Sequence, residues 1–178
     1  MKPAALIACA CMAFLLLACQ RARTEEPIPP VSHVDLPRYV GRWYVIAAIP
    51  TRFERNDFNP VETYRLERSG EIYTQFQFLQ GGFRGSLKAI HSMATIVPGT
   101  GNAEWKVHLF WPLRAQYIVA WLAPDYSRVI VARDARDYVW IMARAPQVPD
   151  REYEDMLART RALGYDVAKI RKSPQQWP

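Results

Sequence analysis

The chain has 178 residues, of which 50% are hydrophobic, and a formal net charge of +6. The basic residues are scattered rather than gathered in a dense tract with aromatics, which excludes the usual pattern of a nucleic-acid-binding protein. A mildly positive surface suits either a neighbouring layer of anionic phospholipid or lipopolysaccharide, or simple solubility.

The first 18 residues predict an export signal rather than part of the fold. Lys2 supplies a positive start, and an almost unbroken apolar run follows that is short for a membrane span. The run ends in Leu16-Leu17-Ala18-Cys19, which resembles the bacterial lipobox, so Cys19 is the predicted site of lipid attachment. The same resemblance implies sorting to the outer membrane, since Gln20 and not Asp follows the cysteine. The alternative is an ordinary secretory signal cut elsewhere.

Loss of the signal would remove Cys9, Cys11 and Lys2, leaving one cysteine and a net charge of about +5. A single cysteine cannot form an internal disulfide, so the core must hold the fold. Several lipid chains on Cys19 would anchor the protein stably. Residues 19–37 contain four prolines among polar neighbours and predict an extended linker between that anchor and a domain at 38–178.

The next part of the chain predicts an all-β body of eight strands. Turn residues such as Ser69-Gly70 separate the strand-like runs, as expected for antiparallel hairpins. Closure of eight strands leaves an interior just wide enough for one small ligand, while a β-sandwich is the alternative. The predicted strands are 42–50, 60–68, 71–79, 84–97, 104–110, 115–123, 127–133 and 138–145.

A helix is predicted after the last of these strands. Asp150 is the expected N-cap, acidic residues follow in the first turn, and Gly164 is the expected end of the helix. Residues 165–170 then predict a short ninth strand.

Three short motifs resemble those of the lipocalin family. Gly41 and Trp43 open the first strand, Arg144 ends the eighth, and Pro124-Asp125-Tyr126 partly matches the Thr-Asp-Tyr turn of the family. With the lipobox, the closest similarity is to bacterial outer-membrane lipocalins, over roughly residues 33 to 171. This resemblance implies an eight-stranded up-and-down barrel with one C-terminal helix, whose floor is formed by Gly41, Trp43 and Arg144. Many secreted lipocalins also carry a disulfide, which this chain lacks.

Strand alternation predicts which side chains line the cup. If Trp43 marks the inward direction, Val45 and Ala47 share it. On the third strand we expect Phe76 and Phe78 to point inward. On the sixth strand either Tyr117 and Trp121 or Ile118 and Leu122 could point inward, and we expect the first pair to do so. A β-bulge would reverse these assignments, and each aromatic could equally be ordinary core. The predicted ligand-binding residues are Phe76, Phe78, Tyr117, Trp121, Tyr138, Trp140 and Met142.

The lipocalin resemblance implies a fatty acid such as palmitate, or a lysophospholipid, as cargo. Arg84, Lys88 or Arg114 would face its head group, unless they are simply solvated. No catalytic triad, metal-ligand spacing or phosphate-binding loop is present, so no enzyme activity, metal or cofactor is predicted.

The sequence thus predicts a lipid-binding lipoprotein of the outer membrane, facing the periplasm. Two alternatives stay open: a structural or assembly lipoprotein with a barrel filled by its own side chains, and an envelope enzyme acting on lipids. The sequence leaves open whether the protein is a monomer or a homodimer.

Overall fold

The structure is a computed structural model that describes residues 26–50, 56–110 and 113–177. The predicted signal at 1–18 and the predicted lipid-attachment residue Cys19 lie outside the described residues.

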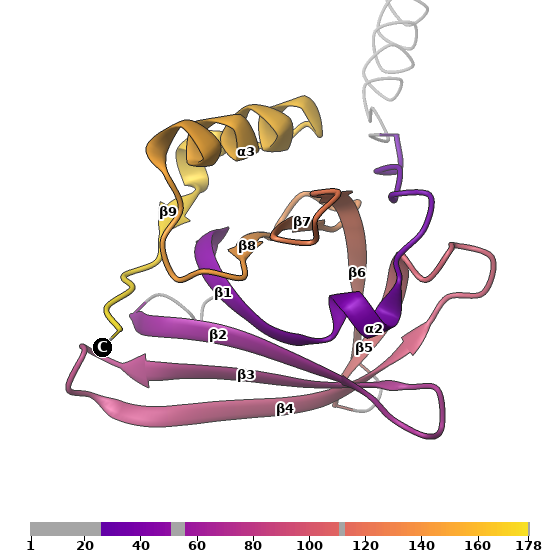
Figure 1. The fold of residues 1–178 in the computed structure, drawn as a ribbon, viewed down its shortest axis with the longest axis horizontal. Coiled ribbons are helices and arrows are strands. Elements are labelled where there is room, and N and C mark those ends of the chain that lie inside the picture. The colour runs from indigo at the N-terminus through magenta and orange to yellow at the C-terminus, as the bar shows by residue number, and fades with distance from the viewer. Residues whose placement is uncertain (1–25, 51–55, 111–112, 178) are drawn as a thin grey trace, which may run out of the picture.

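Eight antiparallel strands close into a barrel, as the sequence predicts (Figure 1). Each strand pairs with the next along the chain, and β1 closes the ring by pairing with both β8 and β2. The predicted boundaries lie within a few residues of the observed ones. The strands are β1 (Gly41–Ile49), β2 (Asp57–Leu66), β3 (Ile72–Gln80), β4 (Ser86–Ile96), β5 (Glu104–Phe110), β6 (Leu113–Leu122), β7 (Arg128–Ala132) and β8 (Val139–Ala143).

One edge of β1 is shared by two partners. β2 pairs with β1 only over Gly41–Tyr44, and β9 (Arg171–Lys172) pairs with Ala47 and Ala48 further along the same strand. The chain beyond β9 spans the place where β2 leaves β1. Here the side-chain amide of Gln175 donates to the carbonyls of Val45 (2.9 Å) and Pro60 (3.1 Å), joining the two strands.

The predicted ninth strand is wrong in position. Residues Val167–Lys169 form a 3-10 turn, η1, and the strand follows it at Arg171. The carboxylate of Asp166 accepts a hydrogen bond from the Ala168 backbone N–H at 3.1 Å, which favours a turn over an extended chain.

The helix α3 (Asp150–Ala162) forms where the sequence predicts it and lies against the outside of the barrel near β7 and β8 (Figure 1). Its N-cap is Pro149 and not Asp150, which is the first helical residue. Gly164, at φ +92°, follows its end. Tyr153 and Met156 are buried beneath the helix, and a salt bridge of 2.8 Å joins Glu152 to Arg128 of β7.

The chain before β1 packs on the barrel. Ile28 and Val34 are buried, and the backbone N–H of Val31 donates to the Val119 carbonyl at 2.9 Å. A one-turn helix that the sequence did not predict, α2 (Leu36–Tyr39), then leads into β1. The described part of the expected linker is therefore part of the domain from Ile28 onward.

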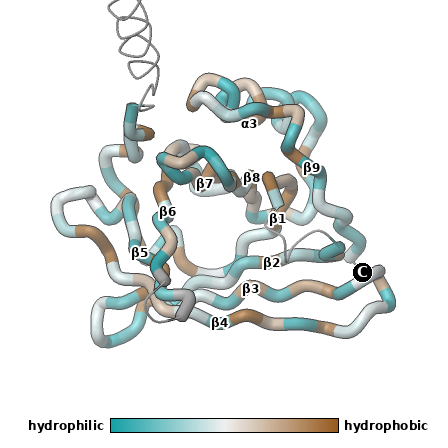
Figure 2. Tube along the Cα trace, turned by 180° about the vertical axis from the view of Figure 1, so that it is seen from behind, coloured by the Kyte–Doolittle hydropathy of each residue, from teal (hydrophilic) through white to brown (hydrophobic). Residues whose placement is uncertain are grey.

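Two buried clusters lie on opposite faces of the sheet. The inner cluster lies inside the barrel and includes Trp43, Phe76, Trp105 and Met142. The outer cluster lies between the sheet and α3 and includes Ile46, Ile130 and Met156. Hydrophobic and hydrophilic residues accordingly alternate along the strands (Figure 2).

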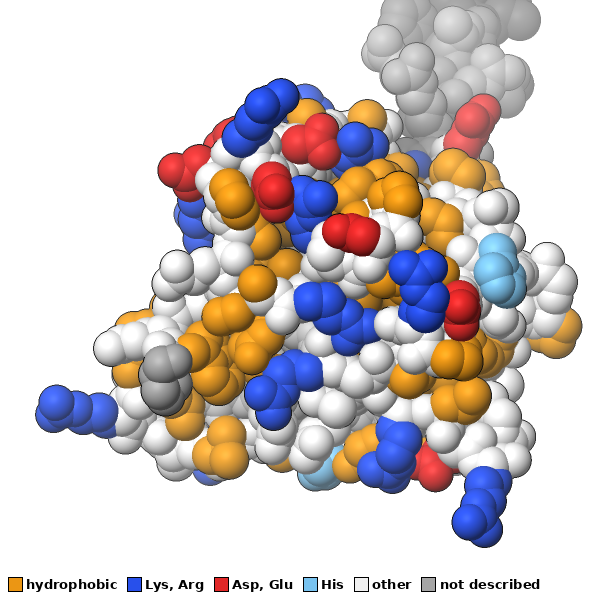
Figure 3. All heavy atoms as spheres, viewed as in Figure 1, with side chains coloured by type: hydrophobic (Ala, Val, Ile, Leu, Met, Phe, Trp, Pro, Cys, Tyr) orange, Lys and Arg blue, Asp and Glu red, His pale blue; other side chains and the backbone are white. Residues whose placement is uncertain are grey.

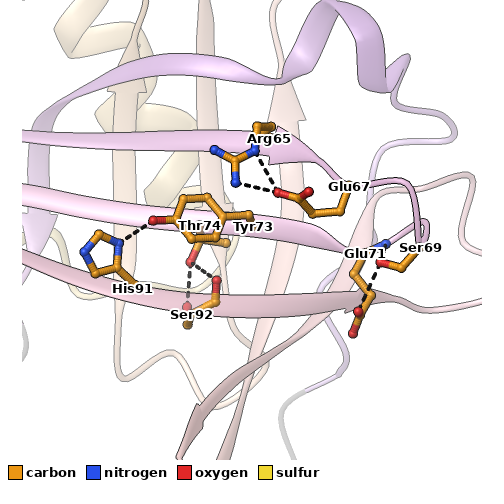
Figure 4. A network of polar contacts seen from close by, with 8 residues as sticks. All are labelled: Arg65, Glu67, Ser69, Glu71, Tyr73, Thr74, His91 and Ser92. Carbon is orange, nitrogen blue, oxygen red and sulfur yellow. Dashed lines mark hydrogen bonds and ion pairs between the residues drawn. The ribbon is translucent and has the colours of Figure 1, made fainter.

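The side chains of β3 illustrate this alternation on its two faces (Figure 4). Tyr73 lies on the outer face, where its hydroxyl bonds His91 Nδ1 at 2.5 Å and the Arg65 guanidinium lies 4.4 Å from its ring centre. The next residue, Thr74, is buried, and its hydroxyl bonds that of Ser92 at 2.5 Å. The polar side chains of this region thus link β2, β3 and β4 to one another.

Candidate functional site

Arg144 closes one end of the barrel over Trp43. Its guanidinium carbon lies 3.7 Å from the centre of the indole, and its N–H groups donate to the carbonyls of Arg42 (2.6 Å) and Tyr39 (2.7 Å). Gly41 sits beside it at φ +98°, a backbone conformation that L side chains rarely adopt. Burial lowers the pKa of Arg144, and the neighbouring Tyr39, Tyr117 and Tyr64 act in the opposite direction.

The turn that partly matches the second lipocalin motif supports the same end. The Tyr126 hydroxyl accepts the Asp35 backbone N–H at 2.9 Å, and the Arg38 guanidinium lies 4.0 Å from the Tyr126 ring centre. Asp125 accepts hydrogen bonds from the side chain and backbone of Ser127, which lower the pKa of its carboxyl. This turn therefore holds the one-turn helix α2 in place.

Five aromatic rings fill the barrel above this end, and we call them the aromatic floor: Tyr39, Trp43, Tyr64, Trp105 and Tyr117. The rings of Trp105 and Tyr117 stack at 4.5 Å, and the Tyr39 and Tyr117 hydroxyls share a hydrogen bond of 2.6 Å. Burial raises the pKa of the three tyrosine hydroxyls. The closed half of the barrel is thus solid.

The opposite half contains a cavity of about 670 Å³. Its walls come from β1, β2, β3, β8 and the chain around β9, and they are mostly apolar. The lining residues are Val45, Ala48, Ile49, Pro50, Asn56, Asp57, Phe58, Pro60, Phe76, Trp140, Lys169, Arg171, Lys172, Ser173 and Pro174. None of the aromatic-floor residues is among them, so the floor marks the bottom of the cavity.

Five of the seven predicted ligand-binding residues divide among three places. Phe76 and Trp140 line the cavity. Phe78 and Met142 belong to the inner cluster without lining it, and Tyr117 lies in the aromatic floor.

Trp121 was predicted to face inward, and this is wrong. The register of β6 against β7 shifts between Val119 and Trp121, so Val119 is inside the barrel while Trp121 packs in the outer cluster. There the Arg159 guanidinium of α3 lies 4.6 Å from the Trp121 ring centre. A single bulge of this kind reverses every later side chain of the strand.

The inward assignment of Ala47 is also wrong. A register shift between Val45 and Ala47 places Ala47 in the outer cluster and Ala48 in the inner one. Tyr138 precedes β8, where the Arg133 guanidinium lies 5.4 Å from its ring centre, and it does not line the cavity.

The cations at the cavity are not those expected. Arg84, Lys88 and Arg114 are exposed and do not line the cavity. Lys169, Arg171 and Lys172 do line it, and sequence reasoning missed them. The sequence does group these three cations in Lys169-Ile170-Arg171-Lys172, which begins within the predicted ninth strand and ends just after it. That grouping could have indicated a positively charged segment beside the barrel.

The described histidines lie away from the cavity. His108, on β5, forms a hydrogen bond of 2.8 Å with the hydroxyl of Thr95 on β4, and His91 bonds Tyr73. Within the described ranges, no three His, Cys, Asp or Glu side chains come together to hold a metal ion. No helix in the part of the chain that the structure describes has the length and apolar character to cross a membrane.

Comparison with known proteins agrees with this geometry. Residues 34–175 match the family described as a lipocalin-like domain. The chain is 32% identical over 168 residues to the outer membrane lipoprotein Blc of Escherichia coli K12, covering 93% of each protein. It is 30% identical over 159 residues to temperature-induced lipocalin-1 of Arabidopsis thaliana, covering 85% of this chain and 84% of the relative.

Solved structures show the same fold. Insecticyanin from the tobacco hornworm Manduca sexta superposes with a TM-score of 0.64 at 17% identity, covering 85% of each chain. Family, barrel and closed-end geometry agree, and the chain is a member of the lipocalin family.

Proposed function

We propose that this lipocalin binds a single-chain lipid, a fatty acid or a lysophospholipid, and stores or carries it in the cell envelope without catalysis. The observation that carries the proposal is the cavity of about 670 Å³ above the aromatic floor. Its walls include Val45, Ala48, Phe76 and Trp140, which offer apolar surface and little hydrogen-bonding capacity. A volume of this size falls in the range of small-molecule sites.

The energy for binding comes from removing the alkyl chain from water. Each methylene buried between these walls stabilises the complex by about 0.8 kcal/mol. The polar residues of the lining, such as Asp57 and Arg171, lie at the ends of β2 and β9, so a polar head group would remain near solvent.

We further propose that Cys19 carries the lipid anchor and that the barrel faces the periplasm from the outer membrane. The support is the lipobox-like Leu16-Leu17-Ala18-Cys19 and the similarity to Blc, which is named as an outer membrane lipoprotein. Anchoring would raise the local concentration of both the cargo and the acceptor membrane.

The aromatic floor favours a second candidate function. Because five rings already fill the closed half, a barrel packed by its own side chains could serve a structural or assembly role. The two candidates differ in one property, namely whether a lipid occupies the open half.

The test is native mass spectrometry of the gently extracted protein, supplemented with free fatty acid. The wild type should retain one lipid. Ala48→Trp should lose it, because Ala48 lines the cavity. Ala89→Trp is the matched control: Ala89 is exposed and pairs with Gln77, whose neighbours Phe76 and Phe78 face inward. A wild type that stays empty in excess fatty acid supports the structural role instead.

A further inference from the structure

The register of β9 turns its two side chains in opposite directions. Arg171 pairs with Ala48, and Lys172 pairs with Ala47. Directly paired residues of antiparallel strands lie on the same face of the sheet. Ala48 belongs to the inner cluster and Ala47 to the outer one, so Arg171 lies on the cavity face and Lys172 on the outer face.

The contacts of Lys172 agree with its outward direction. Its ammonium nitrogen lies 4.2 Å from the ring centre of Tyr153 and 3.7 Å from Asp150 Oδ1, and both partners belong to α3. The charge of Lys172 is therefore already directed to the helix, where acidic and basic side chains both lie on the viewed face (Figure 3).

Arg171, by contrast, forms no ion pair with any carboxylate of the described residues. The nearby Lys169 is 3.8 Å from Asp166 Oδ2 and belongs to its own turn. Asp57, at the start of β2, also lines the cavity. Among the described residues, Arg171 thus presents a guanidinium without an ion-pair partner at the border between an apolar cavity and solvent.

We propose that Arg171 binds the anionic head group, carboxylate or phosphate, of the lipid held in the cavity. The proposal rests on the proposed lipid-binding function and adds to it a site of charge recognition. A guanidinium presents a planar set of N–H donors that matches both anions in a bidentate manner. The alkyl chain would then extend from Arg171 past Ala48 toward Phe76 and Trp140, which line the same cavity.

The experiment compares Arg171→Gln with Arg161→Gln, which removes the same charge from an exposed arginine of α3 that does not line the cavity. Affinity is measured by displacement of a fluorescent probe, for three ligands of equal chain length: a fatty acid, a lysophosphatidic acid and the uncharged fatty alcohol. Arg171→Gln should weaken the fatty acid by about three- to ten-fold, in the range of an exposed charge-assisted contact. Arg161→Gln should leave it unchanged.

The ligand series separates the two sources of the anion. A larger loss for lysophosphatidic acid identifies phosphate as the preferred head group, and a larger loss for the fatty acid identifies carboxylate. The fatty alcohol should bind wild type and Arg171→Gln equally, and rising salt should weaken only the charged ligands.

Two results would overturn the proposal: equal losses in both variants, or a loss for the fatty alcohol as large as that for the acids. Failure of the underlying function is distinguishable, because then the fatty alcohol would not bind the wild type either. Thermal unfolding of both variants checks that the barrel is intact.

Discussion

Arg144 and Trp43, 101 positions apart in the chain, form one unit at the closed end: the guanidinium covers the indole at 3.7 Å and bonds the carbonyls of the turn that leads into β1. The arrangement uses both properties of the side chain, its flat face and its fork of donors. A point charge of the same sign cannot reproduce either.

Arg144→Lys should therefore lower the free energy of unfolding by about 2–4 kcal/mol, because the stack and several carbonyl contacts, two of them partly buried, are lost together. Urea unfolding followed by circular dichroism measures the change. Arg159→Lys is the matched control, since Arg159 also covers a tryptophan, Trp121, but is exposed. Its cost should stay below about 1 kcal/mol. Equal costs for the two variants would contradict the role of Arg144.

The buried tyrosines of the aromatic floor predict a loss of stability at alkaline pH. Burial raises the pKa of Tyr39, Tyr64 and Tyr117 above the ordinary value of about 10. Above pH 10 the unfolded chain releases these hydroxyl protons while the folded barrel keeps them, so unfolding becomes more favourable as pH rises. The full stabilisation is present below pH 10 and declines above it.

Urea unfolding at a series of pH values, with tyrosinate absorbance as a second signal, measures this decline. Tyr117→Phe should make the decline shallower, because one titrating group is gone, although it costs about 1 kcal/mol at neutral pH through the lost Tyr39 bond. A free energy of unfolding that stays constant as pH rises beyond 10 would show that the hydroxyls are accessible to solvent.

A brominated fatty acid should quench the fluorescence of the tryptophan that it touches. Trp140 lines the cavity, whereas Trp121 lies under α3 on the other face of the sheet. Quenching should therefore fall markedly in Trp140→Phe and remain near the wild-type level in Trp121→Phe. The reverse pattern would place the lipid outside the barrel.

Cys19→Ala should release the protein from membranes into the soluble periplasmic fraction, since one cysteine is expected to carry the entire anchor. Fractionation and immunoblotting measure the distribution. Cys11→Ala, within the predicted signal, is the matched control and should leave the protein on the membrane. Membrane association of Cys19→Ala at the wild-type level would contradict the anchor.

The sequence was enough to predict the strand order, the position of α3 and the pairing of Arg144 with Trp43. Turn residues such as Ser69-Gly70 separate the strands clearly, and the motifs fix both ends of the closed floor. Local chemistry and a known family pattern are enough at these positions.

The inward and outward assignment was harder, because a bulge leaves no simple mark in the sequence. Phe76 precedes any shift in β3 and was assigned correctly to the inside, while Ala47 and Trp121 follow shifts and were not. Arg171, which we propose as the head-group cation, was missed for a different reason. Arg171 reaches the cavity only through its pairing with Ala48, a contact between positions 123 residues apart in the chain.

The solid floor also fixes the depth of the cup. Because Trp43, Trp105 and the three tyrosines occupy the closed half of the barrel, a ligand that enters from the open end cannot pass beyond these rings. The distance from these rings to Arg171 then sets the length of alkyl chain that the cavity accommodates best. An alkyl chain shorter than this distance leaves part of the space empty, and a longer one pushes its head group past the guanidinium. The aromatic rings thereby tie the stability of the barrel to a preferred length of tail.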